Sequence, residues 1–109
     1  MSGLPRHRAL VLLEECTGDH VWSVAHCESR GVPAAWIGEL VDAHESGFRH
    51  DSQTLYTDAG VTNQYQGVRD FDLAIRLGQS LGIDVERILA SHWGRAAVVL
   101  AIKEAVSDE

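Results

Sequence analysis

Glycines divide this sequence into segments in which apolar residues recur every three or four positions. Such spacing places the apolar side chains on one face of an α-helix. Gly31, Gly47 and Gly82 each follow a segment of this kind, and glycine readily ends a helix in a left-handed conformation. The clearest segment is 33–46, whose apolar face consists of Trp36, Ile37, Leu40 and Val41. The sequence therefore predicts a mainly α-helical protein.

The same pattern predicts a compact bundle of about five helices, over residues 5–16, 20–30, 33–46, 70–81 and 85–106. Pro5 is favoured at the first position of a helix. Asp19, Asp70 and Asp84 each precede a helical segment, where a carboxylate can accept hydrogen bonds from free backbone N–H groups. The whole chain, residues 1–109, is expected to form a single helical domain.

The last predicted helix is the most apolar, because apolar residues occupy nearly every side of residues 96–102. A helix that is apolar all round is usually buried. We therefore expect this helix to run unbroken through the centre of the core. Its most buried positions are expected to include Ile88, Leu89, Val99 and Leu100.

Residues 49–69 have a different pattern, with two runs of β-forming residues at 54–57 and 61–65. The intervening residues 58–60 read Asp-Ala-Gly, a suitable three-residue hairpin loop with glycine in the left-handed position. The sequence therefore predicts a short β-hairpin inserted between the third and fourth helices. The alternative is an ordered loop of about twenty residues, which is uncommon inside a compact domain unless it is functional.

Composition and charge exclude several classes of protein. Hydrophobic residues make up 45% of the chain, which argues against disorder. No apolar run approaches the roughly 20 residues that span a bilayer, so no membrane association is expected. Two glutamates interrupt the apolar stretch near the N-terminus, which disfavours a secretory signal and favours a cytoplasmic location. The net charge of −7 disfavours nonspecific binding to nucleic acid.

Histidine and cysteine are the candidate ligands for a metal or the candidates for catalysis. The six histidines and two cysteines match no complete zinc motif, because each partial pattern lacks its decisive ligand. Cys27 could meet His20 or His44 only if the second and third helices pack suitably. A cleft that joins Cys27, His44 and His50 would favour a metal or catalytic site. The interpretation we favour is that these side chains are structural, with no cofactor and no catalytic residue.

Residues 70–93 resemble the helix-turn-helix pattern of small bacterial repressors. The residues that carry the resemblance are Ala74, Gly82, Ile83 and Ile88. This resemblance implies a regulator that binds nucleic acid. However, the segment that would read DNA begins with Asp84 and Glu86, where basic or amide side chains usually contact the bases.

Three tryptophans, Trp22, Trp36 and Trp93, are many for a small helical chain. A tryptophan that the core does not need is a typical anchor of a protein interface. The function we predict is a small intracellular protein–protein interaction module without catalytic activity, whose partner is another protein or a second copy of itself. The alternatives are the helix-turn-helix regulator and a small metal-binding or Cys/His-dependent enzyme.

A candidate docking edge lies in and after the predicted hairpin. This stretch concentrates aromatic, amide and guanidinium groups, which often anchor protein contacts. Loops held by a rigid scaffold also carry function disproportionately often. The protein-binding residues predicted here are Tyr56, Tyr65, Gln66 and Arg69.

Overall fold

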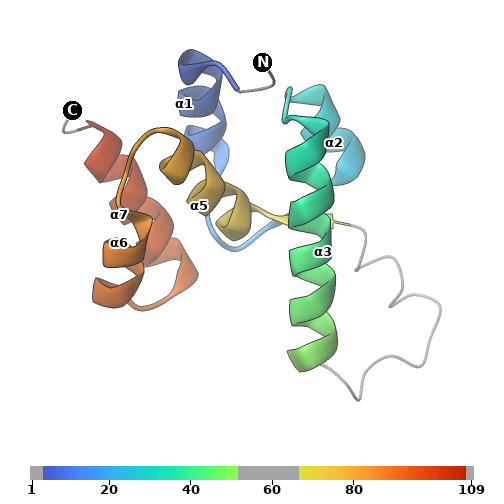
Figure 1. Cartoon of the computed structure of the whole chain (residues 1–109). Coiled ribbons are helices and arrows are strands. Elements are labelled where there is room, and N and C mark those ends of the chain that lie inside the picture. Colours follow the sequence, from blue (N-terminus) through green and yellow to red (C-terminus); the bar gives the residue numbers. More distant parts are fainter. Residues whose placement is uncertain (1–3, 52–66, 108–109) are drawn as a thin grey trace. The chain divides into compact units, whose positions relative to one another are not determined.

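The computed structural model describes residues 4–51 and 67–107, with side chains described for residues 4–43 and 67–107. These residues are mainly helical, which confirms the predicted fold class (Figure 1). A two-stranded antiparallel sheet accompanies the helices. The elements are α1 (Arg6–Glu15), β1 (Val21–Ser23), α2 (Val24–Ser29), α3 (Ala34–Asp51), β2 (Gly67–Arg69), α5 (Asp70–Ser80), α6 (Val85–Ser91) and α7 (Arg95–Ser107).

The chain folds into two compact units. The first unit combines residues 1–20 with residues 70–109 and contains α1, α5, α6 and α7. The second unit is formed by residues 21–69 and contains β1, α2, α3 and β2. That the chain forms a single domain remains a prediction. Among the helices of the described residues, none is both long and apolar enough to cross a membrane.

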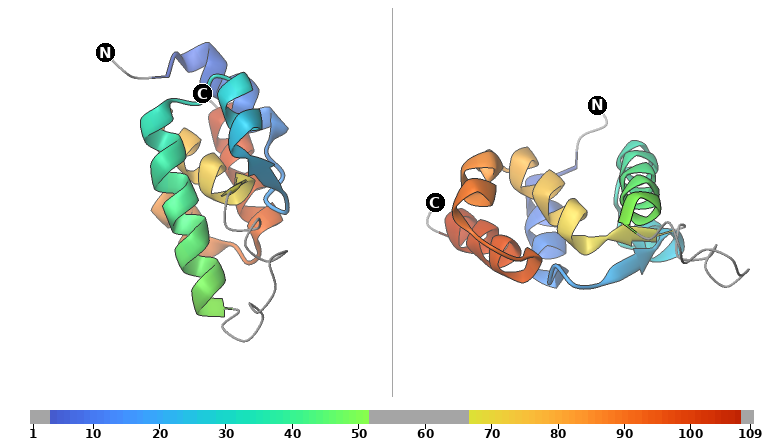
Figure 2. Two further views of the ribbon diagram at one scale, coloured as in Figure 1. Left: turned by 90° about the vertical axis from the view of Figure 1, so that its right-hand side faces the viewer. Right: turned by 90° about the horizontal axis from the view of Figure 1, so that it is seen from below.

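The helix α5 is the centre of the first unit, because it packs against α1, α6 and α7 (Figures 1 and 2). Leu73 and Leu77 of α5 are fully buried, and burial of a leucine side chain contributes about 1.5–3 kcal/mol. The other helices supply the remaining apolar side chains of this core. The buried members are Ala9, Leu12, Leu13, Cys16, Ala74, Leu81, Val85, Val98, Val99 and Ile102.

A close approach of helices in this core depends on Gly78. A Cβ atom at Gly78 would lie 2.9 Å from Val85 Cγ2 and 3.0 Å from Ile102 Cγ2. Both distances are shorter than ordinary van der Waals contact. Any larger side chain at position 78 would therefore push α5 away from α6 and α7.

Two glycine-to-alanine substitutions are expected to have opposite effects on stability. Gly38→Ala in α3 should raise the free energy of unfolding by about 0.5–1 kcal/mol, since no atom of the described residues lies within 4 Å of the added Cβ and alanine favours a helix. Gly78→Ala should lower it by about 0–2.5 kcal/mol, because overpacking costs about 1–3 kcal/mol and the same helical gain offsets about 0.5–1 kcal/mol of that cost. Urea denaturation of the two variants checks this order, and equal shifts would contradict the close packing at Gly78.

The carboxylate of Asp70 fastens the segment after α1 to the start of α5. Asp70 is fully buried. Its Oδ2 accepts hydrogen bonds from the Thr17 N–H at 2.9 Å and the Thr17 hydroxyl at 3.0 Å. Its Oδ1 accepts from the Gly18 N–H at 2.9 Å and the His20 N–H at 3.3 Å. Asp70 was expected to cap its own helix, but these contacts reach fifty or more residues back along the chain.

The second unit is built on the pairing of β1 with β2, in which Trp22 lies opposite Val68 (Figure 2). The helix α3 packs against β2, and α2 packs against both strands and α3. The prediction of a helix over 20–30 is therefore wrong for its first turn, which is strand β1. The helix begins after Ser23, whose hydroxyl accepts a hydrogen bond from the His26 N–H at 3.0 Å.

The predicted ends of the second and third helices have different outcomes. Gly31 has a φ of +86° directly after the helix-terminal turn, as predicted. Gly47 does not end α3, which continues to Asp51. The predicted hairpin at 54–65 lies outside the described residues. The sheet that the structure describes pairs other segments, residues 21–23 and 67–69.

The predicted fifth helix is two helices, α6 and α7, separated at residues 92–94. Asp84 caps α6 as predicted, because its Oδ1 accepts a hydrogen bond from the Arg87 N–H at 3.2 Å. The break falls at Gly94, whose φ is +90°. The prediction of a wholly buried spine is wrong. Of the four residues predicted to be most buried, Val99 is buried, Ile88 is half-buried, and Leu89 and Leu100 are exposed.

Candidate protein-interaction surface

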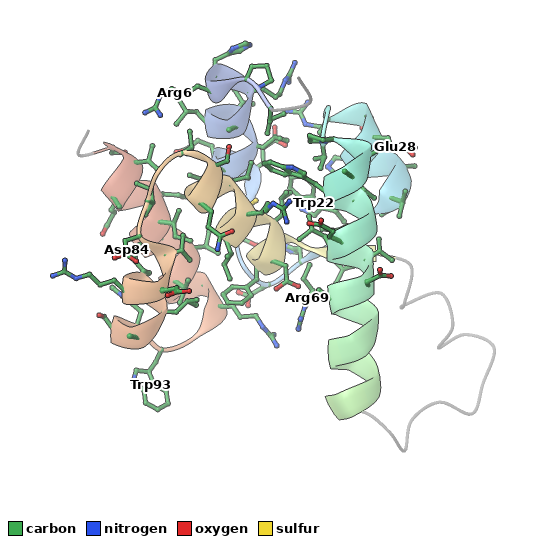
Figure 3. The ribbon with its side chains drawn as sticks, viewed as in Figure 1. Arg6, Trp22, Glu28, Arg69, Asp84 and Trp93 are labelled. Atoms are coloured by element: carbon green, nitrogen blue, oxygen red, sulfur yellow. The ribbon has the colours of Figure 1, made fainter. Side chains whose placement is uncertain are left out.

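The turn between α6 and α7 presents an exposed tryptophan. Trp22 is 8% exposed and Trp36 is half-buried, whereas Trp93 is 93% exposed. The Trp93 ring projects away from the ribbon (Figure 3). The structure thus separates the three tryptophans, two of which contribute to packing and one of which does not.

Trp93 stands directly before α7 but does not pack against the first turns of that helix. The Gly94 carbonyl accepts a hydrogen bond from the Val98 N–H at 3.1 Å, so Gly94 is the N-cap of α7. Trp93 therefore precedes the cap, where an apolar side chain commonly packs against the fourth helical residue, here Val98. At 93% exposure Trp93 makes no such packing, while Val98 is buried in the core.

Apolar exposure continues along one side of α7. Leu100 is 56% exposed, whereas Val99 and Ile102 are buried. On α6, Leu89 is 40% exposed. We call the exposed apolar residues of these two helices and their turn the α6–α7 face, consisting of Leu89, Ala90, Trp93, Ala96, Ala97 and Leu100.

A groove of about 430 Å³ lies at the far end of α7 from Trp93. It is lined by Glu14, Leu100, Lys103, Glu104 and Ser107. The Lys103 ammonium donates a hydrogen bond to the backbone carbonyl of Glu14 at 3.2 Å, which links α7 to the last turn of α1. The groove therefore adjoins the α6–α7 face at Leu100 and is bounded by the ends of two helices.

The docking edge predicted from sequence remains a prediction. Tyr56, Tyr65 and Gln66 lie outside the described residues. Arg69 is the last residue of β2, where it is half-buried and lies opposite Val21. The structure therefore describes one of the four residues and places it in a strand.

The cysteines have structural positions. Cys16 and Cys27 are both fully buried thiols outside any disulfide. Burial raises the pKa of the Cys27 thiol to about 11, and the Glu28 carboxylate adds to the rise. A protonated thiol is a poor nucleophile and a poor metal ligand. The side chains of His44 and His50 are outside the described set, and the described residues contain no group of three potential ligands that could hold a metal ion.

Thr17, His20 and Asp70 have the composition of a hydrolytic triad but a different geometry. The Thr17 hydroxyl lies 3.0 Å from Asp70 Oδ2 and 2.9 Å from His20 Nδ1. In a triad, the histidine stands between the nucleophile and the carboxylate. Here the hydroxyl stands between them, and the neighbouring N–H groups of Thr17 and Gly18 already donate to Asp70. The arrangement is suited to fixing a turn.

The helix-turn-helix resemblance corresponds to α5, the turn at Gly82 and α6. Ala74 is buried and Gly82 has a φ of +86°, which fits the role of each in the resemblance. The first turn of α6, however, exposes Glu86, and the Asp84 carboxylate is engaged as its cap. These acids at the start of a would-be recognition helix disfavour contact with phosphates.

The apolar pattern predicted one unbroken helix over 85–106, which contains Trp93, and therefore did not predict the exposure of this side chain. The available signal was Gly94, which directly follows Trp93 and can adopt the left-handed conformation that separates two helices. Comparisons of the chain with protein-family models, with curated proteins and with solved structures find no match. Residue geometry is therefore the basis for the functional proposal below.

Proposed function

We propose that this protein is a small intracellular interaction module without catalytic activity, which recognises a partner protein through the α6–α7 face. The observation that carries the proposal is the 93% exposure of Trp93. Tryptophan is enriched among the residues that contribute most to binding energy in protein interfaces. Leu89 and Leu100, both exposed, would surround this anchor with further apolar area.

The exposed ring of Trp93 is a source of binding free energy, because a partner that covers it removes apolar area from water. A tryptophan buries about 150–250 Å² when it is covered, and each Å² of apolar area contributes roughly 25 cal/mol. Docking of a partner over Trp93 would therefore contribute roughly 4–6 kcal/mol before the losses of association are subtracted. The buried thiols of Cys16 and Cys27, which form no disulfide, also fit a reducing compartment, and this supports an intracellular location.

Trp93→Ala is expected to abolish partner binding without lowering stability. The side chain makes little contact with its own chain, so the free energy of unfolding should change by less than about 0.5 kcal/mol. Loss of an interface anchor weakens binding by more than about 30-fold. Affinity capture from the native cell, with the wild type and the variant side by side, measures which proteins depend on Trp93.

Val21→Ala provides the matched control, because Val21 is 54% exposed but belongs to β1. Proteins captured by the wild type and by this control, and lost with Trp93→Ala, would support the proposal. The same set of proteins captured by all three chains would refute it.

A further inference from the structure

The charges beside the α6–α7 face select the class of partner. The last turns of α1 and α7 contain no basic residue. The C-terminal end of a helix carries partial negative charge, from carbonyl groups that have no partner within the helix. Glu14 lies in the last turn of α1 and Ser107 in the last turn of α7, and both line the groove. The end of α7 is therefore a negative border of the groove, whereas at the end of α1 the Glu14 carbonyl already accepts a hydrogen bond from the Lys103 ammonium.

The side chains of the groove add to this negative charge. Glu14 and Glu104 are both exposed carboxylates. Among the described residues that line the groove, the cation is Lys103, so two carboxylates stand against one ammonium. The field at this end of α7 is therefore negative, whereas the other end presents the apolar ring of Trp93.

We propose that the occupant of the α6–α7 face is an amphipathic, basic helix of a partner protein, a proposal that rests on the function proposed above. Its apolar side would cover Trp93 and Leu100. Its lysine or arginine side chains would enter the groove beside Glu14 and Glu104. The stretch from Trp93 to Ser107, the last residue of α7, matches a partner helix of roughly four turns, at a rise of 1.5 Å per residue.

Charge also argues against a second copy of this chain as the occupant. Each copy carries a net charge of −7, so two copies repel one another at long range. A basic partner is instead attracted toward the face, which accelerates encounter and favours that partner over acidic competitors.

The test uses a pair of synthetic helical peptides of about 14 residues. One is composed of leucine and lysine in an amphipathic pattern, and in the other every lysine is glutamate. Each peptide carries a fluorophore, and its binding to the full chain is followed by anisotropy. We expect the leucine–lysine peptide to bind, binding to weaken as salt is added, and the leucine–glutamate peptide not to bind.

Charge variants decide whether the groove, and not the total charge, causes the binding. Glu14→Gln with Glu104→Gln should weaken binding of the leucine–lysine peptide about three- to tenfold. The control, Glu28→Gln with Asp42→Asn, removes the same number of exposed charges from α2 and α3 and should change the affinity less than twofold. Trp93→Ala should weaken binding more than about 30-fold.

Three results would overturn the basic-helix proposal. They are equal binding of the two peptides, equal loss in the two pairs of charge variants, and Trp93-dependent dimerisation of the chain alone in sedimentation. Each leaves the interaction module standing if proteins captured from the cell still depend on Trp93. If Trp93→Ala changes neither capture nor peptide binding, both proposals fail.

Discussion

Asp70→Ala is expected to lower the free energy of unfolding by about 3–5 kcal/mol, among the largest single-residue effects in this chain. The substitution removes the shared acceptor of four hydrogen bonds from Thr17, Gly18 and His20. Hydrogen bonds to a charged group contribute about 1.5–3 kcal/mol each, and the total is smaller than their sum because exposed donors regain water. The Gly18 N–H is buried and regains none directly.

Asp84→Asn is the matched control for this prediction. Asp70 and Asp84 both stand at the start of a helix, but Asp84 bonds only locally, to the Arg87 N–H. Asparagine caps a helix about as well as aspartate, so Asp84→Asn should change stability by less than about 0.5 kcal/mol. Urea denaturation followed by circular dichroism measures both variants. Equal, small losses would show that the buried carboxylate does not hold the turn.

Leu77→Ala is expected to cost about 2–5 kcal/mol, the usual range for truncating a buried leucine. Leu77 is fully buried on α5, the helix that contacts the three others of the first unit. Removal of its side chain leaves a cavity that rigid neighbouring helices fill only in part. The same denaturation experiment gives the loss directly.

Leu89→Ala makes the same chemical change at a site that is 40% exposed. We expect Leu89→Ala to lower the free energy of unfolding by less than about 1 kcal/mol, because Leu89 is not buried as the sequence pattern predicted. A difference of at least about 1 kcal/mol between the two variants would support the assignment of α5 as the centre of the core. Comparable losses would place Leu89 in the core and remove it from the α6–α7 face.

The features that sequence predicted well depend on local chemistry. Ser, Asp and Gly act within a few residues of where they stand, so Asp84 could be identified as a cap and Gly82 as a helix end from their neighbours alone. Apolar spacing identified α5 in the same way, and Ala74 of that spacing is buried. These predictions needed no knowledge of the rest of the chain.

The features that sequence missed depend on distant residues. The three residues of β1 are too few to show a strand period, and their partner β2 begins more than forty positions later. Leu100 and Val99 are adjacent and both apolar, yet only the packing of α5 decides which one is covered. The role of Asp70 was misjudged for the same reason, because its donors lie near residue 17.

The hydrogen bond from the Asp70 N–H to the His20 carbonyl, 3.0 Å long, joins the points where the chain leaves and re-enters the first unit. The next pair along the two strands, Val21 and Arg69, opens the sheet of the second unit. Residues 21–69 therefore have the topology of an insertion whose ends meet. Such a segment can be gained, lost or exchanged during evolution without rerouting the rest of the chain, since a short peptide suffices to bridge the gap.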